Sequence, residues 1–369
     1  MNMATKSGLW VAGLACMSLL LAACGNNGDE TGQTDANSSA DTQSTESVSL
    51  IFGTGGTSGS YYPIGGALKR VFEDSDLVDQ VQVVSTGASV QNINNIEDGT
   101  NQLAIVMSDV AYDAINGQGQ FEGREADIKT IAGLYPNVVQ VVATANSGIE
   151  SVADMKGKRI GVGKVGSGVE QSAQKVLEAA GMSYDDLARV SHTGYADSVT
   201  EMSNGNLDAA FFTSGVPNSS ITGLMQNTDV NFVNVDGETA ANLLDKYPYY
   251  EKYEIPAGAP ERYDLDNAVN TVAIRNLLIV PASMSDEVSR DLAKRFYDYL
   301  GTDKVSVGAL KQFDRSRMGR DVVVPLAAGA QSFYDSLGDD AASDAGDSEQ
   351  TDAASDSDSS QDPTQARDS

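Results

Sequence analysis

The chain of 369 residues carries 24 lysines and arginines against 52 aspartates and glutamates, a formal net charge of -28. This negative surplus disfavours binding to nucleic acids and to anionic lipid surfaces. With one histidine, His192, and two cysteines, Cys16 and Cys24, the chain cannot build histidine-rich zinc clusters, and we expect neither a metal nor a cofactor.

Residues 1–23 are typical of a cleaved export signal. Lys6 supplies a positive start, and the apolar run over residues 8–21 is too short to favour a membrane-spanning helix. The run ends in "LAAC", where small residues precede Cys24 as they do at the lipidation site of bacterial lipoproteins. We expect an exported protein that a lipid on Cys24 anchors on the periplasmic side of the cell membrane. An ordinary signal peptide with an incidental cysteine is the alternative.

Two acidic segments flank the part of the chain that can bury a core. Residues 24–47 contain acids but no base, and they predict a disordered tether between the lipid and the fold. Residues 338–369 are rich in aspartate, lack an apolar period and predict a disordered tail. The remaining residues, 48–337, are long enough for two domains.

A unit of strand, small-residue loop and helix recurs in this folded part. The first unit reads "SVSLIF", "GTGGTSGS" and then a helix with Ile64, Leu68 and Phe72 on one face. "QVQVV" and "LAIVM" begin the next two units, and "GKRIGVG" and "LDAAFF" begin two later ones. Strands that alternate with helices across short loops predict parallel sheets with both faces covered.

Two apolar segments predict strands that connect two α/β lobes. They are "VVQVVATANS" at residues 138–147 and "TVAIRNLLIVPAS" at residues 271–283. We assign residues 48–140 to lobe 1 and residues 141–275 to lobe 2. Residues 276–337 then form a returning segment with a crossing strand and terminal helices.

Small residues crowd the loops that follow the predicted strands. Ligands of open α/β sheets bind beyond the carboxyl ends of the strands, which is where these loops lie. Each loop opens a helix, whose free N–H groups favour anionic oxygens, and the glycines allow close approach of the backbone. The pattern predicts a cleft between hinged lobes that binds a small carboxylate.

The first loop does not fit a nucleotide site. Gly53, Gly55, Gly56 and Gly59 miss the G-x-G-x-x-G spacing by one residue, and no acid follows at the distance needed to bind a ribose. A P-loop fails as well, because Val165 stands where serine or threonine is required.

Five ordered blocks carry a family resemblance. "GTGGTSGSYYPIGGAL", "STGASVQNINNI", "LAIVMSDVAYDA", "MKGKRIGVGKVGSG" and "DAAFFTSGVPNSSI" together resemble the TAXI family, the extracytoplasmic solute receptors of TRAP transporters. The resemblance covers about residues 48–337. It implies a type II periplasmic-binding-protein fold, with two α/β lobes, a hinge and a central ligand cleft. It also implies a receptor that delivers a glutamate-like amino acid or an organic acid to an ion-gradient-driven permease with fused subunits. We expect the receptor to be a monomer.

Carried over onto this sequence, the resemblance and the strand-end loops predict a set of ligand-binding residues. The set from lobe 1 comprises Gly56, Thr57, Ser58, Tyr61, Tyr62, Ala88, Ser89, Asn92, Ser108 and Tyr135. The set from the rest of the chain comprises Lys164, Gly166, Ser167, Gly168, Val169, Ser214, Gly215, Pro217 and Arg275.

Several of these residues have a second interpretation. Ser89 would satisfy its hydroxyl by capping a helix, and Tyr62 would face the core. Lys164 stands where the family commonly has a small residue or proline, so it pairs with a second ligand carboxylate or projects into solvent. Arg275 clamps a ligand carboxylate or pairs with an acid across the hinge. Val169 replaces the family's usual threonine, which removes one hydroxyl.

Asp109 has two interpretations as well. Beside an anionic ligand it would repel, so it either caps a helix or meets the ammonium group of an amino acid. Capping is the simpler expectation.

Two other classes of function compete with a transport receptor. A sensor lipoprotein would use the same cleft without transport. A hydrolase would need an activated nucleophile beside an orienting base, and the sequence contains neither G-x-S-x-G nor a motif that places a nucleophile beside His192. We expect a binding protein rather than an enzyme.

Overall fold

The computed structural model describes residues 47–347, with side chains described to residue 338. The predicted signal at 1–23, the lipid site at Cys24 and all but the last residue of the predicted tether at 24–47 lie outside this range. Residues 348–369 of the predicted tail also lie outside it.

Lobe 1 is built on one end of a mixed sheet. Its strand order is β2-β1-β3-β10-β4, in which β1, β2 and β3 are parallel and β10 runs antiparallel to both of its neighbours. The strands are β1 (Val48–Gly53), β2 (Val78–Val84), β3 (Leu103–Met107), β4 (Ile128–Thr144) and β10 (Val269–Pro281). The associated helices are α1 (Tyr61–Glu73), α2 (Ser89–Glu97), α3 (Ser108–Ile115), α8 (Asp286–Leu300), α9 (Gly308–Lys311) and α10 (Ala328–Asp347).

Lobe 2 continues the same sheet from the far half of β4. There the order runs β4-β7-β5-β6, while β8 also pairs with β4 and β9 pairs with β10. The strands are β5 (Arg159–Gly161), β6 (Arg189–Ser191), β7 (Ala209–Ser214), β8 (Val230–Val233) and β9 (Tyr250–Ile255). The helices are α4 (Gly168–Ala179), α5 (Tyr195–Ser203), α6 (Ser219–Met225) and α7 (Gly237–Lys246). Short 3-10 turns are η1 (Gly119–Phe121), η2 (Ala145–Ser147), η3 (Val152–Met155), η4 (Tyr184–Asp186), η5 (Pro260–Arg262) and η6 (Arg315–Arg317).

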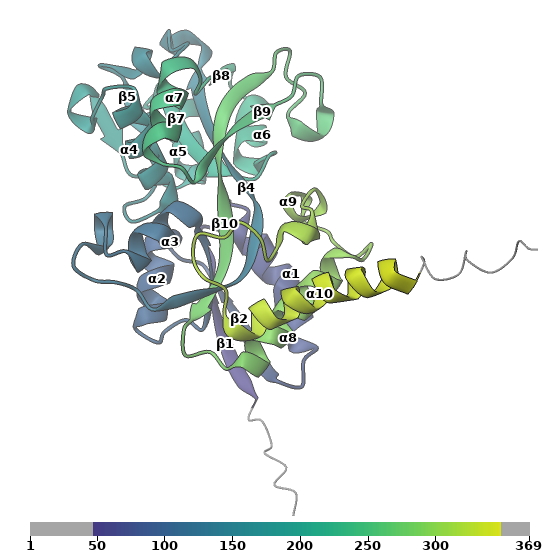
Figure 1. The fold of residues 1–369 in the computed structure, drawn as a ribbon. Coiled ribbons are helices and arrows are strands. Elements are labelled where there is room, and N and C mark those ends of the chain that lie inside the picture. The colour runs from purple at the N-terminus through teal and green to yellow at the C-terminus, as the bar shows by residue number, and fades with distance from the viewer. Residues whose placement is uncertain (1–46, 348–369) are drawn as a thin grey trace, which may run out of the picture. The chain divides into compact units, whose positions relative to one another are not determined.

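The two long strands β4 and β10 pass side by side through both lobes (Figure 1). On the lobe 1 side Arg275 pairs with Pro136, and two residues further along β4 Val138 pairs with Ala273 and also with Ser214 of β7. The hinge region therefore lies near Pro136–Val138 and their partners on β10. Two α/β lobes joined by crossing strands confirm the expected fold class, the type II periplasmic-binding-protein fold.

The predicted helix faces form the core. In α1, Ile64, Leu68 and Phe72 are fully buried, because their spacing of four residues keeps them on one face. In α4, Val176 and Leu177 are buried in the same way. The strand "LAIVM" is buried at every position, as expected for a strand covered on both faces.

Two boundaries differ from the sequence predictions. β4 begins at Ile128, well before residue 138, because its first half pairs with β10 and Pro136 is accommodated beside an irregular register between Arg275 and Leu277. The acidic tail was expected to lack structure from residue 338, but α10 continues to Asp347.

Candidate ligand pocket between the lobes

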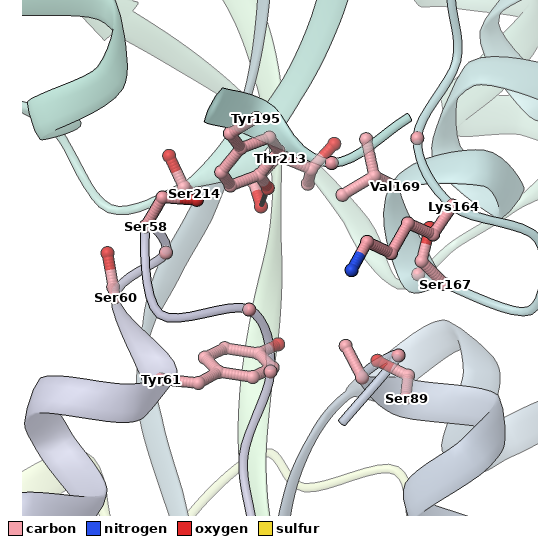
Figure 2. Close-up of a pocket in the computed structure, with 18 of the residues that line it drawn as sticks. Ser58, Ser60, Tyr61, Ser89, Lys164, Ser167, Val169, Tyr195, Thr213 and Ser214 are labelled. Atoms are coloured by element: carbon pink, nitrogen blue, oxygen red, sulfur yellow. Dashed lines mark hydrogen bonds between the residues drawn. The ribbon is translucent and has the colours of Figure 1, made fainter. Parts of the chain in front are cut away.

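A pocket with a cavity of about 270 Å³ lies between the lobes (Figure 2). Lobe 1 contributes the loops that precede α1 and α2, together with β4. Lobe 2 contributes the loops that precede α4 and α5, together with the end of β7. The lining residues are Gly55, Gly56, Thr57, Ser58, Gly59, Ser60, Tyr61, Ser85, Thr86, Gly87, Ala88, Ser89, Met107, Tyr135, Asn137, Gly163, Lys164, Ser167, Gly168, Val169, Thr193, Gly194, Tyr195, Ala196, Asp197, Thr213 and Ser214.

Four helices begin at this pocket. The first residues of α1, α2, α4 and α5 are Tyr61, Ser89, Gly168 and Tyr195, and all four line the cavity. The first N–H groups of a helix have no partner within the helix, and the helix dipole adds partial positive charge there. Two helix starts come from each lobe, so the pocket is electrostatically suited to an anionic group.

Three buried polar atoms of the lining lack a hydrogen-bond partner within the described residues. They are the Tyr135 hydroxyl, the Asn137 side-chain oxygen and the Thr213 hydroxyl. Each of these three residues is at most 3% exposed. An unpaired buried polar group costs about 1–3 kcal/mol. Polar atoms left in this state around a cavity point to a bound molecule that completes their hydrogen bonds.

Other hydroxyls of the lining are already used by the protein. Tyr61 Oη donates to Asn276 Oδ1 at 2.5 Å, and Tyr195 Oη donates to the Thr213 carbonyl at 2.7 Å. Ser89 Oγ accepts from the Met107 N–H at 3.1 Å. These residues shape the pocket, whereas the unpaired atoms are free to bind.

One cation and one carboxylate face the lobe 2 side of the pocket. Lys164 and Asp197 are both exposed, and neither side chain makes an ion pair or hydrogen bond within residues 47–338. Figure 2 shows the Lys164 amino group directed into the cavity. Asp197 lies in the first turn of α5, where a carboxylate is stabilised by the helix dipole.

Burial keeps the pocket tyrosines neutral. Burial raises the pKa of Tyr135. The nearby Ser60 hydroxyl lowers this pKa by a smaller amount, but the two hydroxyls do not meet the geometry of a hydrogen bond. Burial likewise raises the pKa of Tyr195 and Tyr61. These phenols therefore act as neutral hydrogen-bonding groups.

Ala88 holds an unusual backbone conformation at the pocket wall. Its φ of 74° and ψ of -143° belong to a region that glycine adopts readily and alanine does not. Such strain costs about 1–3 kcal/mol and tends to occur at functional sites. The conformation places the start of α2 against the cavity, although Ser89 does not cap that helix, contrary to one sequence interpretation.

The pocket brings together most of the predicted ligand-binding residues, whose contact with a ligand stays a prediction. Val169 lines the pocket and contributes only an apolar side chain to it (Figure 2). The predicted residues that line the pocket are Gly56, Thr57, Ser58, Tyr61, Ala88, Ser89, Tyr135, Lys164, Ser167, Gly168, Val169 and Ser214.

Tyr62 and Asn92 lie outside the lining. Successive residues of a helix point about 100° apart, so Tyr61 faces the pocket while Tyr62 is 36% exposed on the outer side. Asn92 is fully buried behind the loops. Its Nδ2 donates to the carbonyls of Thr54 and Ile105 at 2.7 and 2.9 Å, so it joins the first loop to β3.

Four further predicted residues also lie outside the lining. Gly166 has a positive φ of 73° and donates its N–H to Glu170 at 2.7 Å, so it shapes the turn before α4. Gly215 is packed, since a Cβ there would lie 3.2 Å from Tyr135. Ser108 is buried at the start of α3, and Pro217 is exposed beyond β7.

Arg275 binds backbone carbonyls rather than a ligand carboxylate or an acid across the hinge. Its guanidinium donates to the carbonyls of Leu134, Arg317, Arg320 and Asp321. Burial lowers the pKa of Arg275. The side chain therefore attaches the segment after α9 to the crossing strands, and both sequence interpretations of Arg275 were wrong.

Sequence reasoning missed several lining residues. Asn137 lies within β4, Thr213 lies within β7, and Asp197 follows the start of α5, none of them in a glycine-rich loop. Thr193, Gly194 and Tyr195 belong to "SHTGYAD", which precedes a helix and resembles the other strand-end loops. Applying the same loop rule there would have found them.

His192 does not line the pocket. Its Nδ1 lies 3.1 Å from Glu170 Oε1, and its side chain is 35% exposed. Within residues 47–347 there is no group of three or more histidine, cysteine or acidic side chains placed to bind a metal ion. Among the same residues, no helix has both the length and the apolar character needed to cross a membrane.

The chain shares distant likeness with solved structures. The alkanesulfonate-binding protein SsuA from Xanthomonas axonopodis pv. citri, bound to MOPS, is 13% identical, covers 81% of this chain and 93% of its own, and has a TM-score of 0.43. An ancestral arginine-binding protein bound to arginine is 16% identical, covers 72% and 95%, and has a TM-score of 0.43.

A third structure has similar statistics. A binding-protein component of an ABC phosphonate transporter from Pseudomonas aeruginosa is 11% identical, covers 74% of this chain and 80% of its own, and has a TM-score of 0.42. At these identities and scores, neither ligands nor partners carry over to this chain.

A family model gives the stronger match. The model of the NMT1-like family matches residues 52–338. This range runs from the end of β1 to α10 and includes every residue of the pocket lining. The match covers well over half of the chain and both lobes, and the chain belongs to the NMT1-like family.

Proposed function

We propose that this protein is an extracytoplasmic receptor that binds a small carboxylate between its lobes and delivers it to a membrane transporter. The observation that carries the proposal is the set of unpaired polar atoms on Tyr135, Asn137 and Thr213 around the interlobe cavity. Their unmet hydrogen bonds make the solute-free closed pocket costly, and a solute that bridges the lobes offsets that cost.

The composition of the pocket supports an anionic solute. Four helix starts and the Lys164 amino group supply positive potential, and the Thr213 and Tyr135 hydroxyls can donate. Asn137 Oδ1 accepts, so the solute should also carry a donor such as an ammonium or hydroxyl group. The cavity of about 270 Å³ lies just below the range of about 300–1,000 Å³ typical of drug-sized ligands. A glutamate-like amino acid or a small organic acid satisfies these conditions.

The transporter that we propose is a TRAP permease driven by an ion gradient. Its support is the resemblance of the five sequence blocks to those of TAXI receptors, and all five blocks supply residues to the pocket lining. The "LAAC" sequence supports a lipid on Cys24 as the anchor. An anchored receptor stays near its permease, which raises its effective concentration there.

A thermal-shift panel tests the receptor. The full chain is screened against L-glutamate, 2-oxoglutarate and a set of other amino and dicarboxylic acids. A solute present at 100 times its Kd stabilises by about 2.7 kcal/mol, so a true solute raises Tm clearly. If no carboxylate in the panel raises Tm, whereas an uncharged solute does, the proposed ligand class is wrong.

A matched pair of variants connects the result to the pocket. Thr213→Val should weaken binding of the best acid of the panel about tenfold or more, because the variant loses the Thr213 hydroxyl and with it a hydrogen bond to the solute. Thr193→Val is the control, since the Thr193 hydroxyl already pairs with Ser198 Oγ at 2.8 Å. Equal losses in the two variants would contradict the assigned role of Thr213.

Reconstituted uptake tests the transporter class separately. The receptor is added to vesicles that contain its permease, with the best acid of the panel as labelled solute. Uptake that follows an imposed sodium gradient supports the TRAP assignment. Uptake that requires ATP would contradict that assignment while leaving solute binding intact.

A further inference from the structure

A buried cluster of charges joins the two lobes away from the pocket. Lys175 lies on α4 of lobe 2, and its Nζ is 2.9 Å from Asp109 Oδ2 and 3.3 Å from Asp113 Oδ2, both on α3 of lobe 1. The side chains of Lys175, Asp109 and Asp113 are 9%, 0% and 16% exposed. None of the three lines the pocket. Asp109 was expected to cap a helix or meet a ligand, and it does neither.

Aromatic rings enclose the same lysine. The rings of Tyr247 and Tyr249 lie 5.3 and 5.2 Å from Lys175 Nζ, within the range of a cation–π interaction. Tyr249 belongs to lobe 2, and its ring centre is 5.7 Å from that of Tyr112 on α3 of lobe 1. The ring contact and the ion pairs therefore cross from one lobe to the other at the same place.

The hydrogen-bonding groups at this contact are only partly satisfied in the structure. Asp109 Oδ1, the neighbouring Ser108 Oγ and Gln171 Nε2 on α4 are buried without hydrogen-bond partners within the described residues. Gln171 lies one turn before Lys175 and so on the same face of α4. These atoms would regain water if α3 and α4 separated, whereas the ion pairs and ring contacts would be lost.

We propose that Lys175, with Asp109 and Asp113, forms an interlobe latch that sets the balance between open and closed lobes and thereby the affinity for solute, without touching the solute. The attraction within a buried ion pair is nearly offset by the loss of hydration of the two charges. The open and closed arrangements of the lobes are therefore close in free energy. The apparent affinity of a binding protein scales with the fraction of molecules in the competent state, so the latch acts on affinity through that fraction.

The latch concerns motion of the lobes and does not depend on which solute binds. Its test therefore measures lobe separation with no solute added. In the full chain, Cys16 and Cys24 are replaced by serine, and spin labels are attached at Gln120→Cys in lobe 1 and Asp185→Cys in lobe 2. Both label sites are exposed. Pulsed electron spin resonance then gives the distribution of separations.

Lys175→Met should shift this distribution to longer separations, because Asp109 would remain buried without a cation. Asp109→Asn, which preserves shape, should shift it in the same direction and serves as the test if Lys175→Met does not fold. Lys175→Arg keeps the charge and should retain more of the closed population than Lys175→Met.

Lys246→Met is the matched control. Lys246 also lies over the Tyr247 ring, at 5.2 Å, and pairs with Glu178 on α4, but all three residues belong to lobe 2. Removing this cation should leave the separations unchanged. A folded Lys175→Met or Asp109→Asn whose separations match those of the parent would overturn the latch. So would a Lys246→Met variant that opens as far as Lys175→Met.

Discussion

The pocket and the latch are two parts of one interlobe surface, and they differ in how they hold a lysine side chain. At the pocket, the Tyr135 and Thr213 hydroxyls have no partner within the described residues, and the Lys164 cation is likewise unpaired there. At the latch, Lys175 from one lobe meets two carboxylates from the other. The pocket therefore presents an unpaired cation and unmet hydrogen bonds to a solute. The latch pairs its cation with carboxylates of the protein, although Asp109 Oδ1 stays without a hydrogen-bond partner within the described residues.

This difference separates two contributions to closure. The latch favours contact between the lobes whether or not solute is present, and the pocket disfavours it until a solute arrives. Burial alone would lower the pKa of Lys175, but the nearby Asp109 raises it overall, so the latch cation stays charged. A receptor that closes on its solute, yet opens without it, needs two free energies to be of similar size: the contribution of the latch to lobe contact and the cost of the unpaired groups in the empty pocket.

The largest expected effect comes from breaking the latch on one side. Lys175→Met leaves Asp109 buried without a cation and should lower the free energy of unfolding by about 3–5 kcal/mol, less whatever the chain recovers by opening. Urea denaturation measures the loss. The double variant Lys175→Met, Asp109→Leu should recover much of it, since apolar pairs often replace buried ion pairs well. If the double variant is no more stable than the single one, the loss does not come from the unpaired charge.

A larger side chain at Gly168, where lobe 2 meets lobe 1, should have the next largest effect. A Cβ at Gly168 would lie 2.3 Å from Met107 Sδ and 2.9 Å from Ser89 Oγ, both in lobe 1. Gly168→Ala should therefore oppose closure by about 1–3 kcal/mol and lengthen the label separation described above.

Gly66→Ala is the control for this steric change. A Cβ at Gly66, within α1, meets nothing within 4 Å. It should stabilise the helix by about 0.5–1 kcal/mol and leave the separation unchanged. Similar separations in the two variants would mean that the lobes do not close on Gly168.

Two tyrosines of the pocket distinguish unpaired from paired hydroxyls. Tyr135→Phe removes a buried hydroxyl without a partner, so it should raise the stability of the solute-free protein by about 1 kcal/mol while weakening solute binding. Tyr195→Phe removes the hydrogen bond to the Thr213 carbonyl and should lower stability by about 1 kcal/mol. Thermal unfolding with and without the best-binding acid measures both. A loss of stability in Tyr135→Phe would show that its hydroxyl is already satisfied.

The smallest effect is expected from an ion pair inside lobe 2. The hydrogen bond from Arg159 holds the pKa of Asp208 below its usual range. The pair therefore contributes stability that is fully present above about pH 4 and is lost as the pH falls through the lowered pKa. Because both groups are partly exposed, the contribution should be about 0.2–1 kcal/mol.

Urea unfolding of the parent and Asp208→Asn at pH 7 and pH 3 measures this contribution. The difference in unfolding free energy between the two proteins should shrink at pH 3. A difference that stays constant between the two pH values would show that ionisation of Asp208 is not its source.

The local features of the pocket were largely predictable. Small-residue loops such as "GTGGTSGS" and "KVGSG" follow apolar strands and precede amphipathic helices, so their place at the carboxyl edge of the sheet follows from chain order. Tyr61 and Tyr62 show the limit of this reasoning. They are adjacent and chemically identical, and only the orientation of α1 against the sheet decides which faces the cavity.

Residues within regular elements were harder to assign. Asn137 and Thr213 lie inside strands, where a polar residue is usually interpreted as a surface position or a structural hydrogen bond. Arg275 was assigned to a ligand or an acid because a lone charge in an apolar strand requires a partner. Its partners are carbonyls of Arg317, Arg320 and Asp321, more than 40 residues later in the chain, and nothing local indicates them.

By itself the sequence determined the order of strands, loops and helices, the faces that are buried, and the loops at which helix starts collect. These features depend on periodicity and on the conformational preferences of neighbouring residues. Only the tertiary structure decided which polar groups find partners. Lys175 and Asp109 are separated by 66 residues, and the hydroxyls of Tyr135 and Thr213 become unpaired only once other elements exclude water from them. Hydrogen bonding and ion pairing depend on distance in space, which local sequence does not encode.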